Sequence, residues 1–166
     1  EIEKLKLLSD GQPIDAAYVL AAVADSARFD VFGLIDATLN GDAGHALRML
    51  EGLRGEGEEA LFICAMLARE VRLLAGLAQQ VSQGTALERA FAAARPPVWD
   101  KRKPLLSKAL QRHTARQFNQ LLLDAQTVDA QIKGQAAGDP WISLANLCLQ
   151  LSGQRLSLDP RPARQH

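Results

Sequence analysis

Residues 25–74 read DSARFDVFGLIDATLNGDAGHALRMLEGLRGEGEEALFICAMLAREVRLL, and this stretch decides the fold. Its apolar residues recur at three- and four-residue spacing in three consecutive segments, which is the pattern of amphipathic helices. Gly41 and Asp42 separate the first two segments, because glycine ends helices and aspartate caps their amino termini. Gly55 and Gly57 separate the second from the third. The stretch holds no catalytic pattern, so it predicts a helical packing module.

The flanking sequence predicts more helices and no strand. Asp139 before Pro140 is a strong start signal for the last helix, since proline fits the first helical position. The expected helices cover residues 1–8, 16–23, 30–39, 42–53, 59–81, 85–94, 98–112 (or 100–112), 114–133 and 140–152. The fold class is therefore all-α, a bundle of about six to seven helices preceded by a short helical remnant of another domain.

Two capping-box patterns and one proline refine these boundaries. Thr85 with Glu88, and Thr114 with Gln117, have the spacing in which two side chains satisfy each other's helix-start amides. Pro104 lies in the first turns of its helix or bends it, and the pattern leaves both alternatives open.

Composition narrows the function class. The 166 residues are 48% hydrophobic, 23% charged and only 5% aromatic, and the formal net charge is zero. No global field therefore draws the chain toward nucleic acid or an anionic membrane. No apolar run is long enough to span a membrane, and no signal peptide opens the sequence.

Cys64 and Cys148 fall in apolar helical runs, so we expect buried thiols and a reducing cytoplasm. Because the chain starts at Glu1, we expect it to be a piece of a longer protein.

Catalytic chemistry is not indicated. His45, His113 and His166 have no metal-ligand spacing with each other or with the cysteines. The glycines around residue 55 lack the flanking strand and the lysine of a phosphate-binding loop. We therefore expect no catalytic residue, no cofactor and no metal.

One local charge bias stands out between residues 85 and 116, where eight residues are basic and two are acidic, a net charge of +6. With Trp99 nearby, this segment suits either a solvated face that meets an acidic neighbour or a nucleic-acid patch, and the single tryptophan favours the first. The candidate basic patch consists of Lys101, Arg102, Lys103, Arg112 and Arg116.

An ordered series of short segments resembles one known family, the delta subunit of bacterial DNA polymerase III, over residues 1–152. The segments are EIEKL (1–5), DSARFDVF (25–32), NGD (40–42), ALRML (46–50), GEE (57–59), LAREVRLL (67–74), VWDKRKP (98–104), DAQIKG (129–134), and Trp141 with Leu144, Leu147, Leu149 and Leu151. On this resemblance, residues 1–25 are the end of an AAA+ lid domain and 26–153 a helical collar domain. The proline and arginine content of the last residues predicts a disordered tail over 154–166.

The resemblance implies a role in the clamp loader, which places the beta clamp on primed DNA during replication. In that family the collars of delta, delta-prime and the gamma/tau copies form a ring. The beta clamp is bound by an amino-terminal module that this sequence lacks, so this chain is expected to touch DNA only indirectly and to catalyse nothing itself. The alternative is a helical nucleic-acid-binding module that uses residues 89–116.

Collar association implies apolar side chains left over after the core is filled. The predicted contact residues are Leu50, Leu53, Leu121, Leu122, Trp141 and Leu144.

Overall fold

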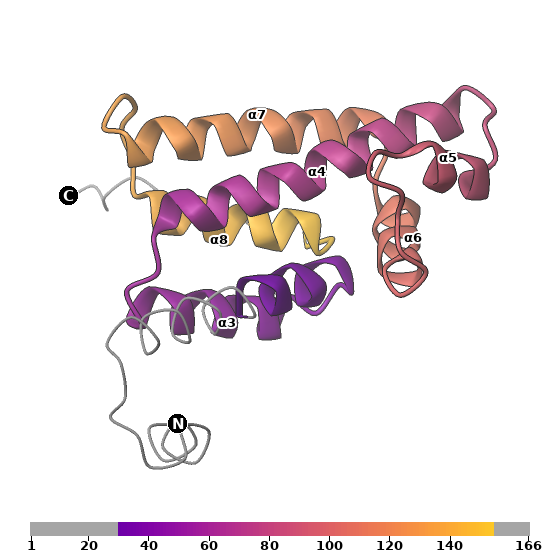
Figure 1. The fold of residues 1–166 in the computed structure, drawn as a ribbon. Helices are drawn as coiled ribbons and strands as arrows, with labels where there is room; N and C mark the ends of the chain where they lie inside the picture. Colours follow the sequence, from indigo (N-terminus) through magenta and orange to yellow (C-terminus); the bar gives the residue numbers. More distant parts are fainter. Residues whose placement is uncertain (1–29, 155–166) are drawn as a thin grey trace, which may run out of the picture.

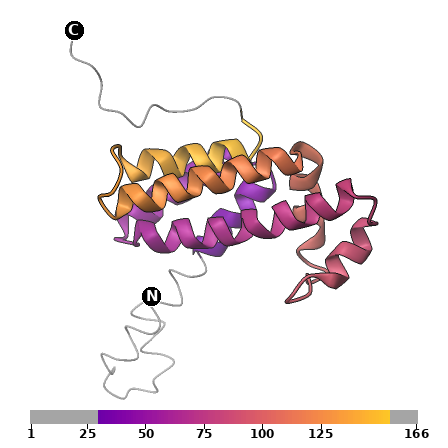
Figure 2. The same cartoon turned by 90° about the horizontal axis from the view of Figure 1, so that it is seen from above.

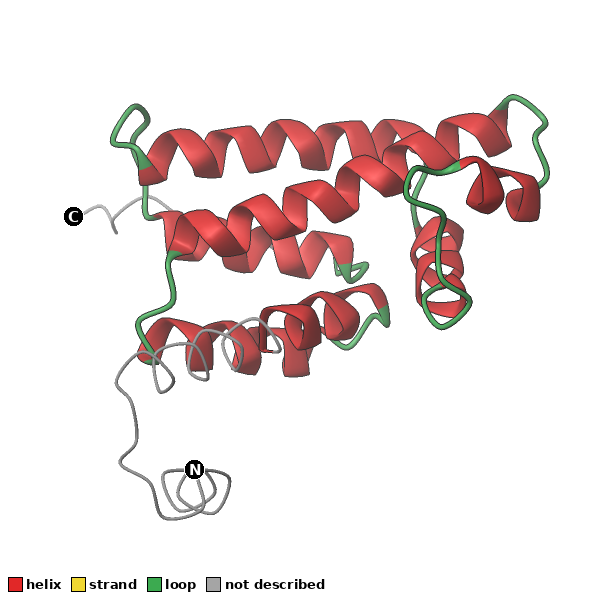
Figure 3. Ribbon diagram, viewed as in Figure 1, coloured by secondary structure: helices red, strands yellow, loops and turns green. Residues whose placement is uncertain are grey.

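The computed structural model describes residues 30–154 of the chain. Within that range there are seven helical segments and no strand, so the predicted all-α class is confirmed. Figure 3 shows these helices in red, joined by loops in green. A helix over residues 30–39 comes first. It is followed by α3 (Ala43–Gly55), α4 (Ala60–Ser82), α5 (Leu87–Ala93), α6 (Lys103–Arg112), α7 (Ala115–Ile132) and α8 (Pro140–Leu151). The expected helices over 1–8 and 16–23 lie outside the described residues.

Helices α4 and α7 form the central pair of the bundle. They are the two longest helices and lie side by side along their length, with α8 against both (Figures 1 and 2). The thiol of Cys64 on α4 donates to the main-chain carbonyl of Ala125 on α7 at 3.5 Å, which marks how closely the pair approaches. Helix α3 packs on α8, while α5 and α6 pack on α4 at the other end (Figure 1).

One continuous core fills the space between these helices. Its largest fully buried side chains include Phe91 of α5 and Phe118 of α7, together with leucines from the helix 30–39, α3, α4, α6 and α8. Burying a leucine or phenylalanine side chain contributes roughly 1.5–3 kcal/mol, so these positions supply most of the driving force for folding.

Most helix starts follow the local sequence signals. Asp42 accepts a hydrogen bond from the amide of His45 at 3.2 Å, and Asp139 accepts one from the amide of Trp141 at 2.9 Å. The capping box of Thr114 with Gln117 is present in both directions, so that prediction is confirmed.

Two expected boundaries were wrong. Helix α5 begins at Leu87 with Ala86 as its N-cap and no side-chain cap, so the box expected from Thr85 and Glu88 does not form. Helix α6 begins at Lys103 rather than at residue 98 or 100, and Pro104 lies in its first turn. Because the first turn has no internal partner for its amides, proline fits there without bending the helix.

Candidate interaction surfaces

Four of the six predicted contact residues lie in the core of the bundle itself. Leu50, Leu53, Leu121 and Leu144 are between 0 and 4% exposed and contact the chain's own helices. In this conformation their side chains face the chain's own core rather than the surface. The physical reason is that amphipathic helices of one bundle already satisfy each other's apolar stripes.

The other two predicted residues remain partly accessible. Leu122 on α7 and Trp141 at the start of α8 are half-buried at the edge of the core. The guanidinium of Arg54 lies 5.5 Å from the centre of the Trp141 ring, a cation–π distance that holds this aromatic side chain against α3.

Apart from Trp99, the largest exposed apolar side chains were not singled out in the sequence. Phe32, Leu123 and Trp99 are 51%, 55% and 75% exposed, and Leu61 and Val81 are also exposed. The sequence did contain a signal for an exposed leucine on α7. Residues 121–123 are three consecutive leucines, and a helix turns about 100° per residue, so all three cannot face the core.

Three of the five predicted basic-patch residues contact their own chain. Arg102 forms an ion pair with Glu70 of α4, whose side chain is almost fully buried. Lys103 pairs with Asp100 at 2.9 Å and with Glu88 at 3.3 Å, and these hydrogen bonds raise its pKa. The positive charge of the segment is therefore partly neutralised within the fold.

Arg112 is the third of these residues, and it joins the ends of two helices. Its Nη2 donates to the main-chain carbonyls of Leu39 at 2.8 Å and of Leu151 at 3.2 Å. These carbonyls lie at the carboxyl ends of the helix 30–39 and of α8, where unpaired oxygens and the helix dipole favour a cation. Burial lowers the pKa of Arg112.

Two glycines make room for this guanidinium. Gly41 and Gly153 follow the two helices with φ of 84° and 94°, values that favour glycine. A β-carbon at Gly153 would lie 3.1 Å from Cδ of Arg112, and one at Gly41 would lie 3.3 Å from its Nη1. The sequence identified Gly41 as a helix stop, but the arginine between the two stops comes from a distant helix and left no sequence signal.

Lys101 and Arg116 remain exposed and keep the basic character of this side. Trp99 lies two residues before Lys101 in the loop that leads to α6. Among the five residues of the predicted patch, all of which lie within the described range, Lys101 and Arg116 are the two that project into solvent. The other three pair with a carboxylate or a main-chain carbonyl of the chain.

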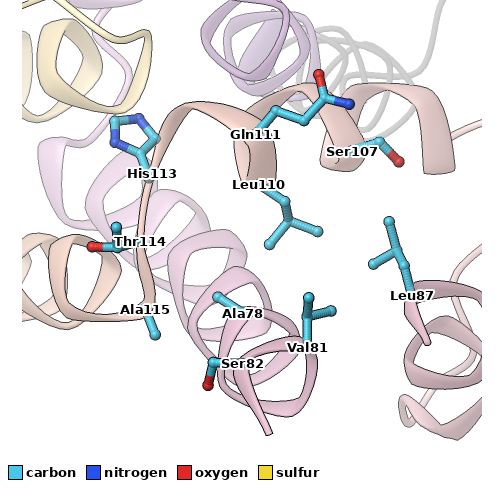
Figure 4. A pocket seen from close by; sticks show the side chains of 10 residues that line it. All are labelled: Ala78, Val81, Ser82, Leu87, Ser107, Leu110, Gln111, His113, Thr114 and Ala115. Carbon is cyan, nitrogen blue, oxygen red and sulfur yellow. The ribbon is translucent and has the colours of Figure 1, made fainter. Parts of the chain in front are cut away.

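A pocket of about 390 Å³ opens where α4 ends and α7 begins (Figure 4). Val81, Leu87 and Leu110, from α4, α5 and α6, point into a common space in this view. No Lys, Arg, Asp or Glu lines the pocket. His113 lies at one edge, where its Nε2 is 2.9 Å from the carbonyl oxygen of Leu151.

Neither cysteine has the setting of a nucleophile. Cys64 and Cys148 are buried free thiols, as expected, and burial raises their pKa values to about 11 and about 12. Reactive thiolates need the opposite shift, a lowered pKa.

Among residues 30–154, no group of three His, Cys, Asp or Glu side chains is placed to hold a metal ion. In the same range no helix has the length and apolar character needed to cross a membrane.

Comparison with known proteins gives a consistent result. Residues 31–158 match the family described as "Processivity clamp loader gamma complex DNA pol III C-term". The chain is 32% identical over 156 residues to DNA polymerase III subunit delta of Escherichia coli (strain K12), covering 94% of this chain and 45% of that protein. It is 26% identical over 156 residues to the subunit of the same name from Haemophilus influenzae (strain Rd), covering 90% and 45%. The chain thus spans just under half the length of these relatives.

Proposed function

Because this chain belongs to the family of C-terminal domains of the clamp-loader delta subunit of DNA polymerase III, we propose that its helical bundle is the collar through which the subunit assembles with its neighbours. The proposed partners are the gamma/tau and delta-prime subunits. Contact with the beta clamp is assigned to the part of the relatives that this chain does not span, and contact with DNA is indirect. The chain itself is assigned no catalytic step, and its proposed location is the cytoplasm.

The outer face of α7 carries the proposal. Between residues 119 and 127 its exposed side chains are Asn119, Gln120, Leu123, Gln126 and Thr127, none of which is charged. The half-buried Asp124 is the single charged residue in this range, and it accepts a hydrogen bond from Gln120 at 3.2 Å. In the middle of this face Leu123 is 55% exposed. Helix faces that only meet water usually carry charged residues, whereas the centres of protein interfaces are depleted of charge. The α7 outer face therefore suits a protein neighbour.

The exposed side of α4 differs in this respect. Arg69 and Arg72 project from it into solvent. Both side chains are charged and exposed, whereas the exposed side chains of α7 between residues 119 and 127 are uncharged. The contrast between the two central helices favours α7 over α4 as the contact helix.

Co-elution tests the assembly proposal. The chain is mixed at micromolar concentration with gamma/tau and delta-prime collar domains and analysed by size-exclusion chromatography. We expect a joint peak for the wild type, and loss of that peak for Leu123→Asp. Leu61→Asp is the matched control, because it places the same charge at an exposed leucine on α4. No joint peak with the wild type would overturn the proposal, and equal loss with both variants would overturn the assignment to α7.

A second candidate function rests on a separate observation. Trp99 is 75% exposed beside the exposed Lys101, and such a pair can stack on and neutralise a single-stranded nucleic acid. It is the weaker candidate, because Arg102, Lys103 and Arg112 are engaged within the fold. DNA binding that falls steeply with salt and is lost in Trp99→Ala and Lys101→Glu would favour it. Absence of salt-dependent binding would exclude it.

A further inference from the structure

The loop between α5 and α6 carries a tryptophan that does not pack on the protein. This loop covers residues 94–102 and runs from the end of α5 to the start of α6 (Figure 1). Trp99 lies near its far end and is 75% exposed. Because a tryptophan gains stability when its large apolar surface is buried, an indole that could fold back onto the bundle would do so. The contacts on each side of Trp99 therefore decide whether its exposure is fixed.

The main chain is hydrogen-bonded on both sides of this tryptophan. Val98 packs at the edge of the core, and its amide donates to the carbonyl oxygen of Phe91 on α5 at 3.5 Å. On the other side, the amide of Arg102 donates to the carbonyl oxygen of Trp99 at 2.9 Å and closes a turn. The direction of the indole therefore depends on where Arg102 is held.

Arg102 is held by a carboxylate on the central helix α4. Its guanidinium forms an ion pair with Glu70, whose side chain is almost fully buried. Glu70 lies on the core side of α4 between Leu67 and Leu74, both of which are 0% exposed, so the carboxylate cannot follow the loop outward. Separation of the pair would leave this carboxylate poorly solvated and without a partner. The ion pair thus opposes movement of the loop away from α4.

Lys103 provides a second and weaker attachment. Its Nζ lies 2.9 Å from the carboxylate of Asp100 and 3.3 Å from that of Glu88 on α5. The side chains of Asp100 and Glu88 are 96% and 78% exposed, and ion pairs surrounded by water contribute little. The pair of Glu70 with Arg102 is therefore the principal attachment of the loop end.

We propose that Glu70, acting through Arg102, is a positioning residue that keeps the indole of Trp99 projected from the bundle. The ligand for this indole rests on the second candidate function, in which an unpaired base stacks on Trp99. An indole that is already held in place loses little conformational entropy when a base stacks on it. A buried negative charge on α4 would then strengthen the binding of a polyanion, which is the opposite of its direct electrostatic effect.

Time-resolved fluorescence anisotropy of the 166-residue chain tests the positioning. Trp99 and Trp141 are its two tryptophans, so Trp141→Phe serves as the parent in which only Trp99 emits. Glu70→Gln in this parent should add a nanosecond loss of anisotropy, because the loop has lost its attachment. Arg102→Lys should restrict the indole as the parent does, since it keeps a cation opposite Glu70.

Two further variants make the anisotropy result specific. Arg102→Gln removes the same ion pair from the loop side, where the arginine side chain is 35% exposed, and should show the same loss as Glu70→Gln. Arg69→Gln is the matched control, because Arg69 is an exposed residue of α4 next to Glu70, and it should leave the decay unchanged. Circular dichroism establishes that each variant keeps the helical fold.

Binding of oligo(dT) gives a second readout, in which positioning and charge predict opposite signs. Glu70→Gln removes a negative charge and releases Arg102, so a purely electrostatic surface would bind oligo(dT) more tightly. The positioning role predicts weaker binding instead, by about fivefold, which is the cost of ordering one large side chain on binding.

The outcomes separate this inference from the function on which its ligand rests. Equal anisotropy decays in Glu70→Gln and the parent would overturn the positioning of Trp99, as would tighter binding of oligo(dT) by Glu70→Gln. If the parent does not bind oligo(dT) but Glu70→Gln still shows the faster decay, the second candidate function is overturned and the positioning of Trp99 is supported.

Discussion

Arg112 donates a hydrogen bond of 2.8 Å from Nη2 to the main-chain carbonyl of Leu39. The two residues are 73 positions apart in the sequence, and the same nitrogen also donates to Leu151 at 3.2 Å. One cation therefore compensates the carboxyl ends of the helix 30–39 and of α8. This arrangement gives a direct prediction about stability.

Arg112→Met should lower the free energy of unfolding by about 2 kcal/mol, because it leaves helix-end carbonyls without their charged donor. Urea denaturation followed by circular dichroism measures the change. Arg116→Met is the control, since Arg116 is exposed, and its effect should stay within about 0.5 kcal/mol. Equal losses in the two variants would show that the helix ends do not depend on Arg112.

The ion pair of Arg102 with Glu70 should behave as a coupled unit. Glu70 is only 6% exposed, so removal of Arg102 leaves a poorly solvated carboxylate without its partner. A double-mutant cycle with Glu70→Gln and Arg102→Gln should give a coupling energy of about 1–3 kcal/mol. The exposed pair of Asp129 with Lys133, 2.9 Å apart on one helix turn, is the reference and should give about 0.3–0.5 kcal/mol. A coupling no larger than this reference would contradict the prediction.

His113 should make the fold less stable at mildly acidic pH. Burial lowers its pKa, the hydrogen bond with Leu151 opposes this, and neighbouring Arg112 lowers it further. The unfolded chain, with a pKa of about 6.5, therefore binds more protons than the native state just below that pH. Stability is fully present above about pH 6.5 and falls as the pH drops toward the folded-state pKa. Denaturation midpoints between pH 7.5 and pH 5 should shift less in His113→Gln than in wild type, while the exposed His45→Gln should retain the wild-type shift.

Two leucines of α7 that lie two positions apart should have opposite roles. Leu121 is 3% exposed, so Leu121→Ala should cost about 2–5 kcal/mol of folding stability. Leu123 is 55% exposed, so Leu123→Ala should change stability by less than about 0.5 kcal/mol. Thermal denaturation separates the two. A large loss with Leu123→Ala would mean that this residue serves the fold and would remove it from the contact surface.

Local signals predicted the elements of the fold well. The expected helix over residues 30–39 is helical throughout and ends at Leu39 as predicted, and the expected helix over 59–81 is α4 displaced by one residue. Asp42, Thr114 and Asp139 cap the helices that they were expected to cap, because capping depends only on neighbouring residues. The resemblance to the delta subunit, drawn from an ordered series of segments, is confirmed by the family match.

The surface could not be predicted in the same way. An amphipathic stripe predicts that Leu50 and Leu121 are buried. It does not show whether they pack against helices of this chain or against another subunit. The basic segment has the same limitation. Its charge is visible in the sequence, whereas the carboxylate opposite Arg102 and the carbonyls opposite Arg112 come from distant helices.

The shared cation of Arg112 also has a mechanical consequence. The two carbonyls belong to the last turns of the first and the last described helices, so one donor from α6 holds these two helix ends together. Separating either end would break a charged hydrogen bond and leave a carbonyl without its partner, so we expect the two helix ends to open together rather than one at a time.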